Sequence, residues 1–212
     1  MRKIILSLFA LVCASTIVFA QNSKSQSGGW NEYVGLYDPK VVDEFRDDNG
    51  EWWYLVVGES VTDRAFNQRN AGSYEEMGDL HNTLLIYNKH SHQSIVVPNY
   101  LIENNQFGGT GSECFESAYF SPAVNGFPKY IYYTLPTYAT ESAIYMYDIQ
   151  NRTSKELCSG SVVAILPSGN LLIGQTGFDH DKNGQIIPGR RGFDCIISSE
   201  GKTLWKSNSY EL

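Results

Sequence analysis

The sequence predicts an all-β fold in which short antiparallel strands follow one another in groups of four. Three observations predict it. From Trp30 onward, apolar residues almost never recur at helical spacing. Short runs of Val, Ile, Leu, Tyr and Phe are instead bounded by clusters of Gly, Pro, Asn and Asp, which is the pattern of strands and turns. These runs recur in units of roughly 40 to 50 residues, the length of a propeller blade.

The first twenty residues are typical of an export signal. Arg2 and Lys3 form a basic start, residues 4–12 form a short apolar run, and residues 18–20 fit the small-residue cleavage rule. We therefore expect a signal peptide over 1–20 and a mature protein that is periplasmic or extracellular, without a membrane anchor. Residues 21–29 are polar and rich in Ser and Gly, which predicts a disordered leader.

The remaining residues, 30–212, are expected to form a single all-β domain that is long enough to bury an ordinary core. Two of the 16 basic residues and none of the 23 acidic residues lie in the signal, so the mature chain has a formal charge of −9. Because Lys and Arg provide the affinity for phosphate, nucleic acid and anionic membrane surfaces are poor partners for this chain. A basic protein partner would be attracted to it.

Three cysteines remain after cleavage: Cys114, Cys158 and Cys195. Disulfides persist outside the cytoplasm, so these residues are disulfide candidates. Three thiols cannot all pair with one another. We therefore expect one disulfide and one buried free cysteine, with three pairings open. No two of the three lie at Cys-x-x-Cys spacing, which argues against a zinc site.

The middle and last units show the strand pattern most clearly. In the middle unit, strands are expected over 117–121, 129–134, 143–149 and 154–158, with turns at 122–126 and 150–153. In the last unit, strands are expected over 162–166, 171–174, 193–198 and 202–205, with a turn at 167–170 and a long loop between the second and third strands.

The first unit is looser. Its strands are expected over 41–45, 52–57, 83–87 and 94–97, with an insertion over 59–82. A second insertion, over 99–115, is rich in Gly and Asn. Long loops in compact β domains are functional or disordered, so a binding surface is expected there first. The three repeat units thus span about 41–98, 117–158 and 162–206.

Three short pieces carry a resemblance to known repeats: residues 119–122 (Tyr-Phe-Ser-Pro), 144–149 (Ile-Tyr-Met-Tyr-Asp-Ile) and 166–170 (Leu-Pro-Ser-Gly-Asn). They resemble bacterial β-propeller repeats of the TolB and WD40-like kind, where a Ser-Pro-x-Gly turn joins the first two strands and a Tyr-Asp-Ile/Leu strand precedes an outer edge strand. The resemblance implies a propeller-like array of four-stranded antiparallel meanders and no particular function. Propellers close with four to eight blades, so three units leave a β-sandwich or open barrel as the alternative.

Trp52, Trp53 and Tyr54 are the candidate binding residues. Side chains alternate between the two faces of a strand, so three adjacent large rings cannot all point into one core. At least one ring is therefore exposed or covered by a loop. An exposed aromatic ring beside acidic turns is typical of protein and sugar contacts. Packing of these rings beneath the 59–82 insertion is the alternative.

A candidate calcium site lies at Asp179, Asp181 and Asn183. Oxygen side chains at alternate positions followed by Gly184 match the first half of a calcium loop. The twelfth position is Arg190 in place of the Glu that the motif requires, so a solvated hairpin loop is the alternative. Apart from calcium, no cofactor is expected.

The sequence favours a protein that is not an enzyme. It contains no Gly-x-Ser-x-Gly elbow, no His-Glu-x-x-His pair and no phosphate-binding glycine loop. His90 and His92 are two residues apart, but they are expected in an exposed turn without a third metal ligand. The carboxylates of Asp43, Glu44, Asp47, Asp48 and Glu51 are expected to form solvated surface rather than a glycosidase pair.

Together these features predict an exported, non-enzymatic binding protein of the cell envelope that engages a protein partner through acidic and aromatic loops. An inhibitor or immunity protein that blocks a basic toxin or hydrolase is the sharper form of this hypothesis. A carbohydrate-binding or carbohydrate-active protein is one alternative, suggested by Trp52, Trp53 and the carboxylates. A structural module of a larger envelope assembly is the other.

Overall fold

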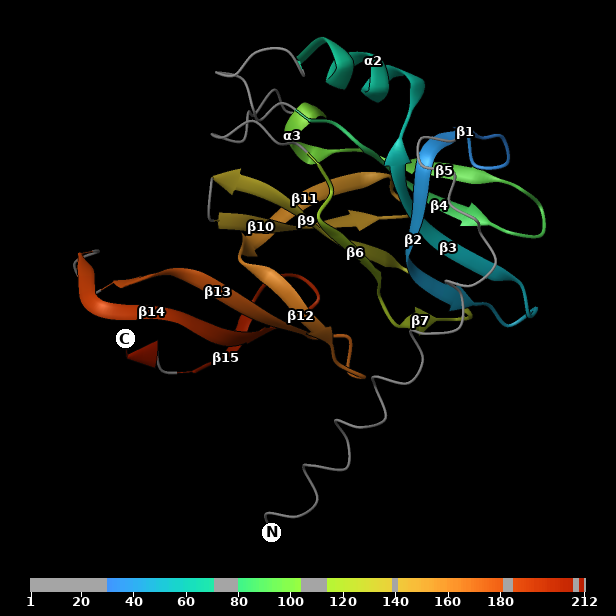
Figure 1. Ribbon diagram of the computed structural model, residues 1–212. Coiled ribbons are helices and arrows are strands. Elements are labelled where there is room, and N and C mark those ends of the chain that lie inside the picture. The colour runs from blue at the N-terminus through green and yellow to red at the C-terminus, as the bar shows by residue number, and fades with distance from the viewer. Residues whose placement is uncertain are drawn as a thin grey trace, which may run out of the picture.

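The structure is a computed structural model that describes residues 30–70, 80–103, 114–138, 141–180, 185–207 and 210–211 (Figure 1). Most of these residues lie in antiparallel strands, which confirms the all-β class. The expected signal peptide and leader lie outside the described residues. In the described part of the chain, neither helix is long and apolar enough to cross a membrane.

The first sheet is a five-stranded antiparallel meander, in which each strand pairs with the next along the chain. It contains the four strands expected for the first unit and one short additional strand at its edge. Strands Leu36–Arg46 and Trp52–Glu59 are longer than the sequence pattern predicts. The strands are β1 (Trp30–Asn31), β2 (Leu36–Arg46), β3 (Trp52–Glu59), β4 (Thr83–Asn88) and β5 (Ser94–Val97).

The middle sheet has four strands in the order β11-β10-β9-β6, as a meander requires. Where the sequence predicts a plain turn after the first strand, the structure has a small separate hairpin, β7 (Ala123–Val124) and β8 (Phe127–Pro128). The strands of the sheet are β6 (Ser117–Phe120), β9 (Tyr130–Tyr138), β10 (Glu141–Asp148) and β11 (Thr153–Ser159).

The last sheet is a meander in the order β12-β13-β14-β15, and β16 also pairs with β14. The prediction of a long loop between residues 174 and 193 is wrong. Strands β13 and β14 continue through this region as a hairpin, in which Phe178 pairs with Arg191 and His180 pairs with Ile186. The backbone ladder persists although the sequence there is polar and rich in Gly. The strands are β12 (Ser161–Ile165), β13 (Leu171–His180), β14 (Ile186–Ile197), β15 (Thr203–Lys206) and β16 (Tyr210–Glu211).

The three sheets stack face to face in series (Figure 1). Strand β6 of the middle sheet lies against β2 and β3, and strand β12 of the last sheet lies against β9 and β10. One core fills the space between the first and middle sheets, with Leu55, Ile86 and Ile131 fully buried. A second core lies between the middle and last sheets, around Ile144 and Leu171. The middle sheet is therefore buried on both faces. Over the described residues, the sheets form neither a closed barrel nor a closed ring.

The insertion after β3 contains a helix that the sequence pattern did not predict. Helix α2 (Val61–Asn70) begins after Ser60, whose hydroxyl accepts a hydrogen bond from the Asp63 N–H. The Asp63 carboxylate in turn accepts from the Ser60 N–H, which forms a capping box. The second insertion begins with the short helix α3 (Tyr100–Glu103). Residues 71–79 and 104–113 of the two insertions lie outside the described residues, so the packing of the aromatic rings beneath the 59–82 insertion stays a prediction.

The expected disulfide is not present. No disulfide joins Cys114, Cys158 and Cys195. Cys114 lies in the loop before β6, where its thiol donates to the Leu80 carbonyl oxygen. Cys158 and Cys195 belong to strands of different sheets and share the second core without reaching bonding distance. Burial raises the pKa of the Cys158 thiol to about 11, so this thiol stays protonated at neutral pH.

Asp43 connects the first sheet to the middle sheet. Its Oδ2 accepts a hydrogen bond from the Phe120 N–H at 2.8 Å, and its Oδ1 accepts from the Glu44 N–H at 2.9 Å. Burial raises the pKa of this carboxyl above 3.8, and the two hydrogen bonds offset only part of that effect. The charged form of Asp43 is therefore less favourable in the folded protein than in the unfolded chain.

A pH dependence of stability follows from this raised pKa. The folded state binds the Asp43 proton more tightly, so this group stabilises the fold most below pH 3.8, and that stabilisation is lost as pH rises through the folded-state pKa. Asp43→Asn cannot titrate. In urea denaturation at a series of pH values, we expect the free energy of unfolding of Asp43→Asn, relative to the parent protein, to increase as pH rises over this window. A difference that stays constant with pH would contradict this assignment.

Candidate functional site

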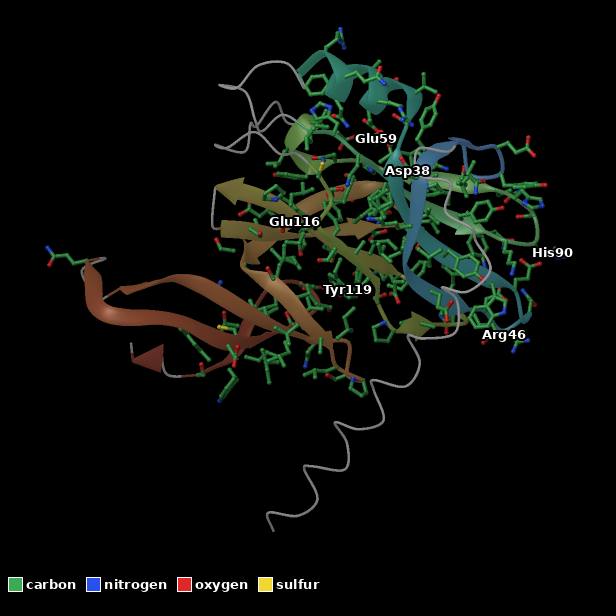
Figure 2. All side chains as sticks on the ribbon, in the orientation of Figure 1. Asp38, Arg46, Glu59, His90, Glu116 and Tyr119 are labelled. Carbon is green, nitrogen blue, oxygen red and sulfur yellow. The ribbon has the colours of Figure 1, made fainter. Side chains whose placement is uncertain are left out.

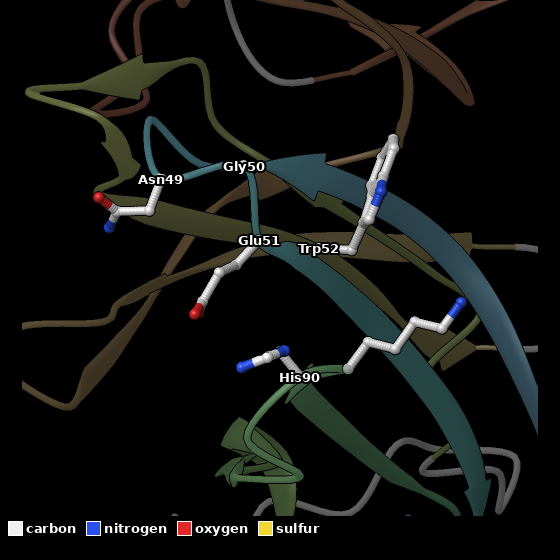
Figure 3. A pocket seen from close by; sticks show the side chains of 6 residues that line it. Asn49, Gly50, Glu51, Trp52 and His90 are labelled. Atoms are coloured by element: carbon white, nitrogen blue, oxygen red, sulfur yellow. The ribbon is translucent and has the colours of Figure 1, made fainter.

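Two turns lie side by side at one end of the first sheet. The turn between β2 and β3 and the turn between β4 and β5 border a cavity of about 520 Å³, which we call the Trp52 cavity. Figure 3 shows its labelled residues around this space. The volume lies within the range of small-molecule pockets and of pockets that receive a side chain of a partner. The lining residues are Asn49, Gly50, Glu51, Trp52, Lys89 and His90.

Asp47 shapes the first of these turns. Its carboxylate accepts hydrogen bonds from the N–H groups of Asn49 and Glu51 and from Trp53 Nε1. Gly50 completes the turn with a φ of 82°, a left-handed conformation that glycine adopts without strain. Although desolvation acts to raise the pKa of Asp47, these hydrogen bonds outweigh it and lower the pKa. Asp47 is thus a charged carboxylate that stabilises the turn bordering the Trp52 cavity.

Asn88 links the two turns. This side chain is almost completely buried, and its Nδ2 donates to Glu51 Oε2 at 2.8 Å. Its Oδ1 accepts from the N–H groups of His90 and Ser91, both at 2.8 Å. A single buried amide therefore fixes Glu51 on one wall of the Trp52 cavity and His90 on the other. No sequence motif marks Asn88 for this role.

The rim of the cavity is a stack of three side chains. The Arg46 guanidinium lies 5.7 Å from the centroid of the Trp52 ring. On the same face, the Trp52 and Tyr54 rings are stacked with centroids 6.4 Å apart and planes inclined by 10°. Trp52 is 37 % exposed and Tyr54 is buried. Burial, and secondarily the charge of Glu44, raises the pKa of Tyr54, so the Tyr54 hydroxyl stays neutral beneath the exposed ring.

Trp53 lies on the opposite face of β3. Its ring packs edge-on against Phe127 at 5.0 Å, next to the core between the first and middle sheets. The prediction that the three adjacent rings cannot all point into the core is confirmed, since the Trp52 ring is partly exposed and the Trp53 ring packs against the core. Of the three candidate binding residues, Trp52 therefore lines the cavity, Tyr54 supports it from below, and Trp53 is a packing residue.

The two histidines occupy the β4–β5 turn, as the sequence predicts. His92 stacks on Tyr33 with ring centroids 5.5 Å apart, and its Nδ1 shares a 2.6 Å hydrogen bond with the Tyr87 hydroxyl. His90 instead lines the Trp52 cavity. Tyr33 and His92 thus extend the aromatic surface across the outer face of the first sheet.

The candidate calcium residues are not tested by the structure. Asp179 lies at the end of β13, and Asp181 and Asn183 fall outside the described residues. Among the residues that the structure describes, no three His, Cys, Asp or Glu side chains group as metal ligands would.

Charge is distributed unevenly along the chain. Residues 30–97, which form the first sheet and its insertion, contain five basic and twelve acidic residues. The sequence segment 161–212, which includes the strands of the last sheet, contains five of each. The acidic residues are therefore concentrated in the part of the sequence that contains the first sheet and its insertion. A positively charged ligand is attracted toward this end of the molecule.

Comparison with known proteins yields distant structural similarity. No family model and no curated protein matches the sequence. An acylaminoacyl peptidase in complex with Z-Gly-Gly-Phe-chloromethyl ketone aligns with 86 % of this chain and 27 % of its own, at 13 % identity and a TM-score of 0.44. The Pyrococcus horikoshii acylaminoacyl peptidase aligns with 82 % of this chain and 25 % of its own, at 14 % identity and a TM-score of 0.43. This chain thus spans about a quarter of the length of these peptidases.

Proposed function

We propose that this protein is an exported, non-enzymatic binding protein that engages a basic protein partner through the Trp52 cavity. The single observation that carries the proposal is the Arg46–Trp52–Tyr54 stack at the cavity rim. Trp, Arg and Tyr are the residue types that contribute most to binding energy at protein interfaces. The stack holds the exposed Trp52 ring in one orientation before binding, which reduces the entropy lost on association.

The acidic first sheet supports a basic partner. The cavity wall itself contains Glu51 together with Lys89 and His90, and Asp47 and Asp48 lie in the adjacent turn, so the attraction comes from the net charge of the sheet as a whole. Opposite charges across an interface increase the association rate and exclude partners of the wrong charge. A basic toxin or hydrolase that is blocked by insertion of one of its side chains beside Trp52 fits this surface. The export signal expected over residues 1–20 would bring the protein to the envelope, where such a partner acts.

A propeller-like arrangement is part of the same proposal. Three antiparallel meanders follow one another along the chain and stack in series, as successive blades do. Residues 119–122 contain the end of β6 and the start of the turn after it, and residues 166–170 form the turn after β12, so both pieces lie at the end of the first strand of their sheets, which supports the resemblance to TolB and WD40-like repeats. In such arrays, the loops at one end of the sheets form the binding surface, and the two turns of the Trp52 cavity lie at one end of the first sheet.

Carbohydrate binding is the second candidate function. The observation that favours it is the composition of the cavity wall, where an aromatic face adjoins an amide, a carboxylate and two basic side chains. Tryptophan presents an apolar face to a ligand, and the polar side chains supply donors and acceptors for hydroxyl groups. The net negative charge of the first sheet does not contribute to binding of a neutral sugar, and we therefore rank this function second.

Site-specific photo-crosslinking in the organism that carries the protein tests the proposal. A photoreactive residue at position 52 is expected to trap a basic protein, and less of it as the salt concentration rises. The same residue at Val124, which is 61 % exposed on the β7–β8 hairpin, serves as the control and is expected to trap none. If position 52 traps no protein at any salt concentration, or the same proteins as position 124, protein binding at this site is refuted. Binding of the purified protein on a glycan array that Trp52→Ala abolishes would then support the second candidate.

A further inference from the structure

The wall of the Trp52 cavity carries charged groups of both signs. Glu51 belongs to the turn between β2 and β3, whereas Lys89 and His90 belong to the turn between β4 and β5. Within the described part of the chain, no ion pair joins Glu51 to either of these two basic residues. The acidic and basic groups of the wall therefore do not neutralise each other by direct contact, and a ligand can reach both.

Two hydrogen bonds fix the two turns relative to each other. The buried Asn88 Nδ2 donates to Glu51 Oε2 at 2.8 Å, and the Lys89 N–H donates to the Trp52 carbonyl oxygen at 3.0 Å. Figure 3 shows the Glu51 side chain directed away from the Trp52 ring, toward the part of the cavity that His90 borders. The acidic group and the aromatic face thus occupy different places in one preformed site, which reduces the cost of ordering the site on binding.

This arrangement favours a ligand that carries both charges. A group with only a positive charge is repelled by Lys89, and a group with only a negative charge is repelled by Glu51. An ammonium and a carboxylate that are joined by an aliphatic chain complement both residues. The chain itself packs against the Trp52 ring, as the stems of long charged side chains do on apolar surfaces. A lysine with a free α-carboxylate has this form.

The hydrogen bonding of Glu51 favours lysine over arginine. A guanidinium binds a carboxylate most strongly through two parallel N–H donors, one to each oxygen. Asn88 already donates to Oε2 of Glu51, so the second arm of a guanidinium would compete with this buried amide. An ammonium is a compact point charge that needs only one oxygen. The carboxylate of Glu51 is therefore better suited to a lysine side chain.

We propose that the Trp52 cavity receives the carboxy-terminal lysine of the basic partner. The lysine ammonium pairs with Glu51, the terminal carboxylate pairs with Lys89, and the aliphatic chain packs on Trp52. This inference deepens the proposed function and rests on it. Arg46 and His90 lie at the outer end of the first sheet, away from β13, β14 and β15 (Figure 2). Chain termini lie at the surface of most folded proteins, so a terminus of the partner can enter at this end.

Calorimetric titration of the purified protein tests this inference. The probes are an acetylated tripeptide that ends in lysine with a free carboxylate, the same tripeptide as its carboxy-terminal amide, and free lysine. The acid peptide is expected to bind at least about tenfold more tightly than the amide, as loss of a charged contact predicts. Lys89→Met is expected to abolish this difference between acid and amide. Glu51→Gln, which keeps an acceptor for Asn88, is expected to weaken both peptides. The matched control is Lys129→Met, which removes an exposed lysine outside the cavity and is expected to change nothing.

Far-UV circular dichroism verifies that each variant is folded. The inference is overturned if the acid peptide does not bind at millimolar concentration, or if acid and amide bind the parent protein equally. Free lysine that binds as tightly as the acid peptide would assign the cavity to the amino acid and also overturn it. A basic protein that is trapped at position 52 but does not end in lysine overturns this inference and leaves the proposed function standing. No trapped protein at position 52 overturns the proposed function, whatever the peptides do.

Discussion

Ile131→Ala and Ile144→Ala are each expected to lower the free energy of unfolding by about 2–5 kcal/mol. The two isoleucines are fully buried in the middle sheet, Ile131 in the core against the first sheet and Ile144 in the core against the last sheet. In a sheet with one solvated face, only one of two such positions would be costly. Because the middle sheet is covered on both faces, the same substitution creates a cavity in either core. Urea denaturation monitored by fluorescence measures both values.

The control for this pair is Val163→Ala, which removes apolar volume from an exposed position on β12. Its expected effect on the free energy of unfolding is within about 0.5 kcal/mol, the range of ordinary surface substitutions. A cost below about 1 kcal/mol for either isoleucine would show that the corresponding face of the middle sheet is not packed as the structure has it.

Although the residues are adjacent, Trp52→Ala is expected to reduce partner affinity and Trp53→Ala is expected to reduce stability. Trp52→Ala removes the exposed ring of the cavity rim, so it is expected to weaken partner binding at least about thirtyfold with little change in stability. Trp53→Ala removes the ring that packs on Phe127 and donates to Asp47, so it is expected to lower the free energy of unfolding by about 3 kcal/mol. The affinity of each variant for the partner identified by crosslinking, and its free energy of unfolding in urea, are measured and compared.

Trp52→Phe is the conservative control, since it keeps an aromatic face beside Arg46 and Tyr54. It is expected to retain more affinity than Trp52→Ala. Equal loss of affinity in Trp52→Ala and Trp53→Ala, with equal loss of stability, would mean that the two rings act only through the fold. The assignment of Trp52 to the binding surface would then be withdrawn.

Most of the fold follows from short-range pattern in the sequence. The runs around Tyr130–Thr134 and Ala143–Asp148 are almost continuously apolar, rich in Tyr and Ile, and end at turn residues, so their strands were predictable to within a few residues. Helix α2 was missed because its apolar residues show no helical periodicity. Its signal was the Ser60-x-x-Asp63 capping box, a weak pattern in isolation. The β13–β14 hairpin was missed because its distal half depends on cross-strand pairing, which composition does not reveal.

The candidate site was predictable only in part. Alternation along β3 required that Trp52 and Trp53 face opposite sides, but it does not tell which one is exposed. Arg46 follows from the hairpin register, because a turn over residues 47–51 places it opposite Trp52. Asn88 and His90 reach the cavity from a different hairpin, and only the three-dimensional arrangement of the sheet brings them there. The prediction of a disulfide was wrong because it was based only on an oxidising compartment. Such a compartment permits a disulfide, but the distance between the two thiols decides whether it forms.

Amide hydrogen exchange tests the stacked arrangement of the three sheets most directly. Slow exchange marks backbone hydrogen bonds that open only with global unfolding. We expect the slowest amides in β9 and β10, the two central strands of the sheet that is covered on both faces, and fast exchange in the edge strand β15. If the amides of β9 and β10 exchange as fast as those of β15, the middle sheet is not enclosed between the other two and the stacked arrangement is wrong.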